Sequence, residues 1–229
     1  MPKPVALITG ASRGIGRSTA IRLGRDYDII AVARIKLDLD SLSKEIAASG
    51  GNCQTLPLDL SDHAATDKAL LGLDCDVLVN NAGVGPVKPF LELTPEEWHT
   101  IVDVNLNALF HVTRAVLPGM VKRRRGHVII VGSIAGRGAF VGGTAYAASK
   151  HAVVGFAECL MLEVREHGVK VSTVNPGSVA TDFSARADAS WMLSPDEVAE
   201  SIAHIVATPP DVLVHSLEIR ALAPPKRPH

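Results

Sequence analysis

A tyrosine and a lysine four residues apart are the strongest pair of chemically useful side chains in this sequence. Tyr146 and Lys150 stand in the run Tyr-Ala-Ala-Ser-Lys, and residues at this spacing lie one turn apart on the same face of a helix. A phenol with its ordinary pKa of about 10 is a poor base at neutral pH, but a nearby ammonium lowers that pKa. The pair therefore predicts a tyrosine that gives or takes a proton at a carbonyl or alcohol oxygen.

A serine upstream is placed to assist the same chemistry. Ser133 follows the apolar run 127–131 and precedes Tyr146 by 13 residues, so its hydroxyl is predicted to hold a substrate oxygen beside the phenol. Tyr27, the other tyrosine, precedes a predicted strand and belongs at the end of the sheet opposite to the ligand-binding edge. Serine is also a common turn residue, and a helix can carry Tyr and Lys by chance, so a purely structural interpretation stays open for each.

A glycine-rich segment near the start has the position of a phosphate-binding loop. Thr9-Gly10-Ala11-Ser12-Arg13-Gly14-Ile15-Gly16 follows a strand-like run and opens a predicted helix. Glycines there allow a tight turn close to a pyrophosphate, and the free N–H groups and dipole of the helix start favour that anion. The glycine spacing is GxxxGxG rather than GxGxxG, and a plain turn is the alternative for this segment alone.

The end of the second predicted strand indicates which dinucleotide would bind. An acid at that place binds the ribose 2′-OH of NAD, whereas an arginine accommodates the 2′-phosphate of NADP. The strand ends in Arg34 and carries no acid there, and Arg13 in the glycine segment could reach the same phosphate. Two guanidiniums make a charge-assisted fork, so NADP(H) is predicted to be preferred over NAD(H). Both arginines could instead be ordinary solvated side chains.

These residues need a scaffold, and the sequence alternates strand-length apolar runs with helix-length amphipathic stretches. Strands are expected at 5–8, 29–33, 54–58, 77–79, 127–131, 169–174 and 216–219, and helices at 15–25, 38–49, 62–71, 95–123, 145–167 and 195–207. Runs that are apolar throughout indicate a sheet covered on both faces. The alternation predicts an α/β fold, a Rossmann-like doubly wound parallel sheet of about seven strands with helices on both faces.

Length and composition narrow the class of protein. The 229 residues suffice for one domain, and 47% hydrophobic against 21% charged residues argue against extended disorder. A net charge of −1 offers no general attraction for nucleic acid or an anionic membrane. Without a CxxC or HExxH motif no metal site is predicted, and the three cysteines are expected to be reduced and mostly buried. No apolar run reaches the length of a signal segment or membrane span, which predicts a soluble cytoplasmic protein.

Residues 1–222 are expected to form a single NAD(P)-binding domain, followed by a flexible tail at 223–229. The tail is Pro-rich and basic and cannot form a core. The one basic run, at 122–125, ends a predicted helix, where cations complement the helix dipole. A nucleic-acid site is therefore not predicted there.

Taken together, these motifs resemble those of the short-chain dehydrogenase/reductase family, in its short single-domain branch. The resemblance is strong over about residues 4–182 and looser over 183–220. The matching segments are Thr9–Gly16 for the family's TGxxxGIG cofactor loop, Asp59-Leu60 for its adenine-contacting pair, Asn80–Gly83 for NNAG, and Asn175–Thr181 for the segment that lines the nicotinamide.

The resemblance implies a role for each matching residue. Asn105, Ser133, Tyr146 and Lys150 would be catalytic, with Asn105 holding a water of the proton relay. The implied cofactor contacts, to which the strand-end Arg34 is added, are Gly10, Ser12, Arg13, Gly14, Ile15, Gly16, Arg34, Asp59, Leu60, Asn81, Ala82, Gly83, Tyr146, Lys150, Pro176, Gly177, Val179 and Thr181. For Asp59 and Asn80, capping of nearby backbone is the alternative.

The predicted function is reversible hydride transfer between NADP(H) and a small-molecule carbonyl/alcohol pair, with Tyr146 as general acid or base. The family also implies a homodimer or homotetramer formed through the long helices 95–123 and 145–167. Two alternatives stay open: a catalytically idle NADP-binding sensor or scaffold, and an epimerase or dehydratase on the same fold.

The substrate is not fixed by these residues. The short lid at 182–193 carries the apolar Phe183, Trp191 and Met192, and Arg137 could bind a carboxylate or be an ordinary loop arginine. Small ketones, keto-acids, sugars and quinones all remain candidates.

Overall fold

A single parallel sheet carries the rest of the molecule. The computed structural model describes residues 2–183 and 190–222. Within them the strands are β1 Val5–Thr9, β2 Asp28–Ala33, β3 Cys53–Pro57, β4 Val77–Asn80, β5 Gly126–Val131, β6 Val169–Pro176 and β7 Ser216–Ile219. Their order is β3-β2-β1-β4-β5-β6-β7. The order reverses between β1 and β4, and in such sheets ligands bind outside the carboxyl ends of the strands at this switch point.

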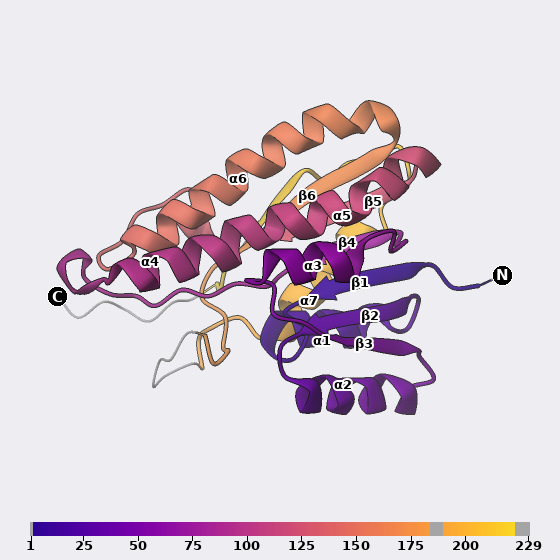
Figure 1. Cartoon of the computed structure of the whole chain (residues 1–229), viewed down its shortest axis with the longest axis horizontal. Coiled ribbons are helices and arrows are strands. Elements are labelled where there is room, and N and C mark those ends of the chain that lie inside the picture. Colours follow the sequence, from indigo (N-terminus) through magenta and orange to yellow (C-terminus); the bar gives the residue numbers. More distant parts are fainter. Residues whose placement is uncertain (1, 184–189, 223–229) are drawn as a thin grey trace.

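Helices cover both faces of the sheet (Figure 1). They are α1 Gly14–Leu23, α2 Lys36–Ala48, α3 His63–Leu70, α4 Pro95–Val102, α5 Ala108–Arg123, α6 Thr144–Val164 and α7 Pro195–Val206, with short 3-10 turns η1 Phe90–Glu92, η3 Ile134–Gly136 and η4 Arg165–His167. Leu23, Leu39 and Ile202 of α1, α2 and α7 pack on one face of the sheet, and Leu70, Val112 and Val153 of α3, α5 and α6 pack on the other. The predicted doubly wound α/β fold is confirmed.

The central strands are apolar throughout because both of their faces are buried. In β1, Ala6 and Ile8 belong to the core beneath α1 and α7, while Leu7 between them belongs to the core beneath α5 and α6. Full burial of one Leu or Ile side chain stabilises a fold by about 1.5–3 kcal/mol. Through the same alternation along each central strand, both helical layers pack against one sheet and are stabilised there.

The predicted helix at 95–123 is interrupted. Asp103–Asn107 (η2) form a π-helical turn between α4 and α5, and such turns are most often found at functional sites. The start of α4 is as expected, because Thr94 and Glu97 form a reciprocal capping box. Ser194 and Glu197 cap α7 in the same way.

The prediction that the cysteines are mostly buried is wrong. All three thiols are free, but only Cys75 is buried, and Cys159 is exposed. Cys159 lies on α6, in the part of that helix that faces away from the sheet, where the helical period requires no apolar side chain.

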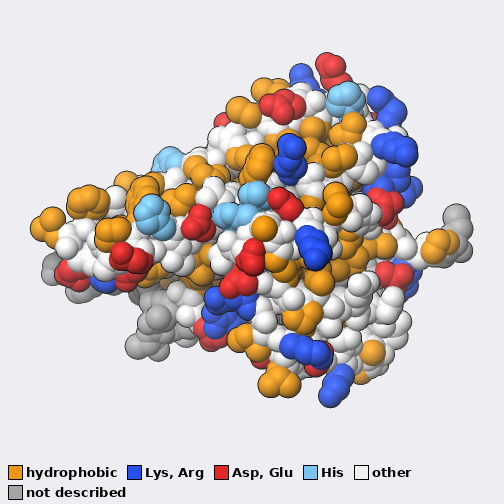
Figure 2. All heavy atoms as spheres, viewed as in Figure 1, with side chains coloured by type: hydrophobic (Ala, Val, Ile, Leu, Met, Phe, Trp, Pro, Cys, Tyr) orange, Lys and Arg blue, Asp and Glu red, His pale blue; other side chains and the backbone are white. Residues whose placement is uncertain are grey.

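The surface mixes charges of both signs with scattered hydrophobic side chains (Figure 2). The basic run at the end of α5 is engaged locally: Arg123 pairs with Asp74, and Arg125 lies 2.6 Å from Asp76. Arg124 adopts a left-handed conformation with φ of 52° and donates to the Glu166 carbonyl. Within residues 2–183 and 190–222, none of the helices combines the length and hydropathy needed to cross a bilayer, and no three ligating side chains are grouped to hold a metal.

We predict that buried His127 makes the fold sensitive to acid. Its Nε2 lies 2.8 Å from Ser172 Oγ between β5 and β6, and burial, with a contribution from Lys170, lowers its pKa to about 3. Below about pH 6.5 the unfolded chain binds a proton at this histidine, whereas the folded chain does not. The free energy of unfolding therefore falls by up to about 1.4 kcal/mol for each pH unit of acidification.

The measurement is urea unfolding between about pH 7 and about pH 4. His127→Gln keeps a hydrogen-bonding group for Ser172 without the titration and should flatten the pH dependence, with the exposed His167→Gln as the control for loss of one histidine. An unchanged slope in His127→Gln would contradict the prediction.

Candidate active site

The glycine segment folds as a loop between β1 and α1, over the carboxyl end of the sheet. Ala11 N donates to Val32 O at 3.1 Å, which ties the loop to the end of β2. Gly10 has φ of +65°, and a Cβ there would lie 2.8 Å from Asn81 Nδ2. Only glycine meets both conditions, so this position is fixed by the backbone and by its neighbour.

The segment after β4 is bonded to this loop. Thr9 Oγ1 accepts from Asn81 N and Ala82 N, both at 3.0 Å, and Asn81 Nδ2 donates to Thr9 O at 3.0 Å. Asn80 is not a local cap, because its Nδ2 donates to Thr113 Oγ1 of α5 at 3.0 Å. These bonds hold Asn81 and Ala82 against the end of β1, beside the glycine loop.

The first turn of α1 suits an anion. It has no side-chain cap and no acidic residue, in contrast to α4 and α7. The segment after β6 also reaches this loop, since a Cβ on Gly14 would lie 3.1 Å from Thr181 Cγ2. Gly177 N donates to Ile219 O, and Val179 forms a bridge with Leu193, which fixes the path between β6 and Thr181.

Both arginines predicted to bind the 2′-phosphate lie exposed at this edge. Arg13 Nη1 lies 3.5 Å from Asp182 Oδ2, with both side chains largely in solvent. Arg34 follows β2 and lies near Asp59, whose pKa is lowered by hydrogen bonds from Ser61 and, more weakly, by the Arg34 charge. Asp59 Oδ1 accepts from Ser61 N at 3.0 Å and Ser61 Oγ at 2.7 Å, so the local cap considered as its alternative role is present.

Tyr146 lies in the first turn of α6, with the Ser133 hydroxyl beside its phenol. Ser133 follows β5 and its Oγ also accepts from Ala135 N at 3.1 Å, which orients the hydroxyl. Burial raises the pKa of the Tyr146 phenol, and the bond to Ser133 opposes that rise. The expectation that Lys150 lowers this pKa below its ordinary value is wrong for the structure described, because burial outweighs the stabilisation of the phenolate.

Lys150 is buried and forms one hydrogen bond at the end of the sheet. Its Nζ donates to Val131 O of β5 at 2.9 Å and lies 5.9 Å from the centroid of the Tyr146 ring. Burial lowers the pKa of the ammonium to about 8. The lysine is therefore held one helical turn below the tyrosine, as the spacing predicted, but its cation is directed at the backbone of β5.

Asn105 lies in the π-helical turn and connects three segments. Its Oδ1 accepts from Val84 N and its Nδ2 donates to Val84 O, both at 2.8 Å. Nδ2 also donates to Ser149 Oγ at 2.9 Å, and Ser149 in turn donates to Tyr146 O at 2.8 Å. The side chain thus positions the start of α6 and the loop after β4.

Asn105 and Lys150 do not bond directly. A Cβ on Gly83 would lie 3.4 Å from Asn105 Oδ1 and 4.0 Å from Lys150 Nζ, so this glycine separates them. A cavity of about 10 Å³ is lined by Thr9, Asn80, Asn105 and Lys150 among others. That volume is close to what one water needs, and the polar lining offers it partners.

Three contributing residues were missed from the sequence: Val84, Gly85 and Ser149. A Cβ on Gly85 would lie 2.3 Å from Tyr146 Cδ2 and 3.0 Å from Phe183 Cζ, so the backbone itself forms the wall beside the phenol. The signal for Ser149 was its place between Tyr146 and Lys150. Nothing in the order of residues indicated that Gly85 would meet a ring 61 positions later.

Comparison with known proteins agrees with this arrangement. A sequence model of the family described as short chain dehydrogenase matches residues 4–190. The chain is 34% identical over 235 residues to the NADP-dependent 3-hydroxy acid dehydrogenase YdfG of Salmonella typhi, covering 94% of each.

Two solved structures extend the comparison. The closed form of serine dehydrogenase complexed with NADP+ is 33% identical with a TM-score of 0.88, covering 94% of each chain. The 3-oxoacyl-[acyl-carrier protein] reductase with bound NAD from Brucella melitensis is 31% identical with a TM-score of 0.85, covering 95% of this chain and 90% of that one.

We predict that Gly85→Ala lowers turnover by at least about 100-fold, because the new methyl must displace the Tyr146 ring and misplacement by about 1 Å is enough for such a loss. Gly155→Ala in α6 is the matched control, since nothing lies within 4 Å of a Cβ there. The control should keep full turnover and gain up to about 1 kcal/mol of stability from its helical site. Steady-state rates and urea unfolding of both variants check this, and wild-type turnover in Gly85→Ala would refute the close approach.

Proposed function

Because the chain belongs to the short-chain dehydrogenase/reductase family of oxidoreductases, we propose that it transfers hydride between NADPH and a carbonyl/alcohol substrate. The observation that carries this proposal is the placement of Tyr146, Ser133 and buried Lys150 together at the sheet edge that also carries the glycine loop, with Lys150 Nζ 5.9 Å from the centroid of the Tyr146 ring. NADPH, when bound, supplies the hydride.

Each side chain then has a task that its position supports. Tyr146 gives the carbonyl oxygen a proton, and Ser133 holds that oxygen by a second hydrogen bond. Lys150, which lies one helical turn from Tyr146 and bonds the end of β5, would hold the nicotinamide ribose. Asn105 and the small cavity beside it support a relay that returns a proton from solvent.

The residues at the sheet edge fit a dinucleotide phosphate. The uncapped start of α1 would hold the pyrophosphate through its N–H groups. Arg34 and Arg13 would hold the 2′-phosphate, and Arg13 would exchange its exposed partner Asp182 for that anion. Asp59 and Leu60 would border the adenine. Ser12, Ile15, Asn81–Gly83 and the segment Pro176, Gly177, Val179 and Thr181 would line the rest of the site.

We further propose that residues 1–222 act as one cytoplasmic domain with 182–193 as the substrate lid; residues 184–189 and the tail 223–229 lie outside the described part. A homodimer or homotetramer would form through α4, α5 and α6. Exposed Trp98, Phe110 and Leu162 on these helices support such a contact.

The proposal predicts that Tyr146→Phe loses at least about 100-fold in turnover, because the general acid is removed. NADPH affinity should be nearly unchanged, since the ring and its packing remain. Absorbance of NADPH with a panel of aldehydes and ketones measures turnover, and fluorescence titration measures binding. Wild-type rates in Tyr146→Phe would remove this residue from the mechanism, and bound NADPH with no oxidation by any carbonyl would favour an idle sensor.

The proposal also predicts that NADPH binds at least about tenfold tighter than NADH, through charge-assisted bonds to the 2′-phosphate. Arg34→Gln should remove most of that difference and leave the dissociation constant for NADH unchanged. Arg25→Gln is the control, because Arg25 is exposed at the opposite end of β2. Equal dissociation constants for the two cofactors in the wild type would refute the arginine clamp.

A further inference from the structure

The surface that adjoins Tyr146 on the solvent side is apolar. The Phe183 ring lies 5.6 Å from the Tyr146 ring, centroid to centroid, at an interplanar angle of 52°. Both rings press against Gly85, where no side chain intervenes. Phe183 and the backbone at Gly85 therefore border the Tyr146 ring.

The next loops outward extend this apolar surface. Lys88 N donates to Gly142 O at 2.9 Å, which joins the loop after β4 to the loop before α6. Val87 lies over Gly142 and the Phe140 ring lies over Gly143, since a Cβ on either glycine would come within 3.0 Å of that side chain. Gly143 is the residue immediately before α6, the helix that carries Tyr146.

We call Val87, Phe140, Val141 and Phe183 the apolar rim. All four side chains are exposed, Val141 by 95%. Exposed apolar groups that form one patch beside a site mark a ligand-binding surface more often than isolated ones do.

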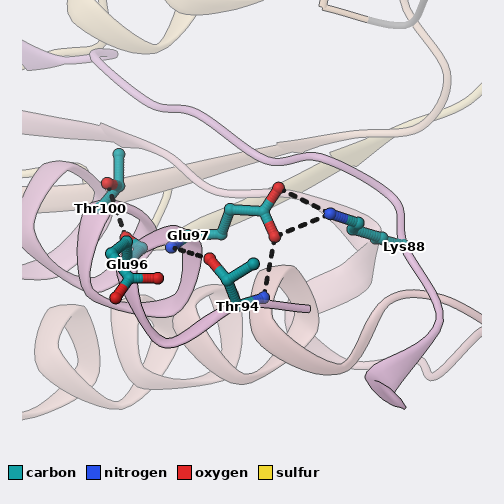
Figure 3. A network of polar contacts seen from close by, with 5 residues as sticks. All are labelled: Lys88, Thr94, Glu96, Glu97 and Thr100. Carbon is teal, nitrogen blue, oxygen red and sulfur yellow. Dashed lines mark hydrogen bonds and ion pairs between the residues drawn. The ribbon is translucent and has the colours of Figure 1, made fainter. Parts of the chain in front are cut away.

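Of the described cations around the rim, Lys88 and Arg13 are paired with carboxylates, whereas Arg137 contacts only a neutral hydroxyl. Lys88 Nζ lies 2.9 and 3.0 Å from the two Glu97 carboxylate oxygens, and Glu97 is held in turn by the Thr94 cap (Figure 3). Arg137 Nη2 donates to Ser216 Oγ at 3.4 Å, directed toward β7. Arg13 pairs with Asp182, whose carboxylate stands next to Phe183.

These contacts decide between the open substrate classes. Among the described residues, Lys88 and Arg13 are already paired and Arg137 is directed toward β7, so a carboxylate placed on the rim would lose hydration without gaining any of these three cations, and such a transfer is costly. It would also face the negative charge of Asp182. An alkyl or aryl group placed there would cover exposed apolar surface and gain roughly 25 cal/mol for each Å² removed from water.

We propose that the substrate is a neutral ketone or aldehyde whose apolar group lies on the apolar rim, and that carbonyl compounds carrying a carboxylate are poor substrates. This inference rests on the proposed oxidoreductase function. It distinguishes this chain from the relatives named 3-hydroxy acid dehydrogenase and serine dehydrogenase, because the proposed substrate carries a neutral apolar group and no carboxylate.

The test compares matched substrates with the whole protein and NADPH. kcat/KM for methyl 5-oxohexanoate should exceed that for 5-oxohexanoate at least about tenfold, because the carbonyl is the same and only the charge differs. From 2-butanone to 2-octanone, kcat/KM should rise on the order of threefold per methylene until the rim is covered. Calorimetric titration of the ester and the acid should show the same order of affinity.

Two lysine substitutions test whether the ester-to-acid ratio of kcat/KM depends on the apolar rim. Val141→Lys should lower the ester-to-acid ratio at least about fivefold by supplying the missing cation, with NADPH affinity unchanged. Leu71→Lys is the control, since Leu71 is equally mobile in solvent at 82% exposure but follows α3 and lies outside the rim. The control should keep the wild-type ratio.

The outcomes separate the two proposals. An acid used as well as its ester, a flat ketone series, or a wild-type ratio in Val141→Lys would overturn the neutral-substrate inference and leave the oxidoreductase function standing. A change of assembly mass in Val141→Lys with no change in ratio would overturn it in favour of a contact between copies. Absence of NADPH oxidation with every carbonyl would reject the proposed function, and the calorimetric order of ester and acid would then decide the inference alone.

Discussion

The buried ammonium of Lys150 is the constraint on which the site depends. A cation taken out of water is unstable unless it is paired, and here it has one backbone partner, Val131 O at the end of β5. That bond fixes α6 on the sheet at the level where β5 ends, and so fixes Tyr146 one turn away above Ser133. The low pKa of the lysine and the high pKa of the tyrosine have the same origin in burial. The fold thus keeps the phenol and the ammonium largely out of water.

A second set of bonds joins the end of β1, where the glycine loop begins, to the segment after β4 and the start of α6. Thr9 uses its hydroxyl to hold two N–H groups of the segment after β4, and Asn81 returns a bond to the backbone of β1. Asn105 extends the unit by binding both backbone groups of Val84 and the Ser149 hydroxyl. Nearly all of these partners are main-chain atoms, so the arrangement tolerates change in the surrounding side chains more easily than change in Thr9, Asn81 or Asn105 themselves.

Periodicity and local chemistry were enough to predict the architecture. The strands and helices fall within two or three residues of their expected ranges because each central strand is apolar on both faces and because Thr94 and Ser194 cap their helices as capping residues do. The Tyr146–Lys150 pair and the glycine loop followed from spacing and strand ends. The spacing could not predict the direction in which the Tyr146 pKa shifts, because that pKa depends on burial, which only tertiary packing sets. Gly85 was missed for the same reason, because its role depends on a contact with a ring far along the chain. The exposure of Cys159, in contrast, follows from its place on the helical period of α6.

The π-helical turn at 103–107 sets the orientation of Asn105 relative to the rest of the helix. One residue fewer there would let regular helical bonding run from α4 into α5 as far as Pro118, which lacks the N–H that such bonding needs. Loss of one residue rotates everything before it by about 100° relative to everything after it. Asn105 would then swing away from Val84 and Ser149, so the shorter chain would be the better helix and the poorer enzyme. The extra residue of the π-helical turn thus directs the Asn105 side-chain amide toward Val84 and Ser149.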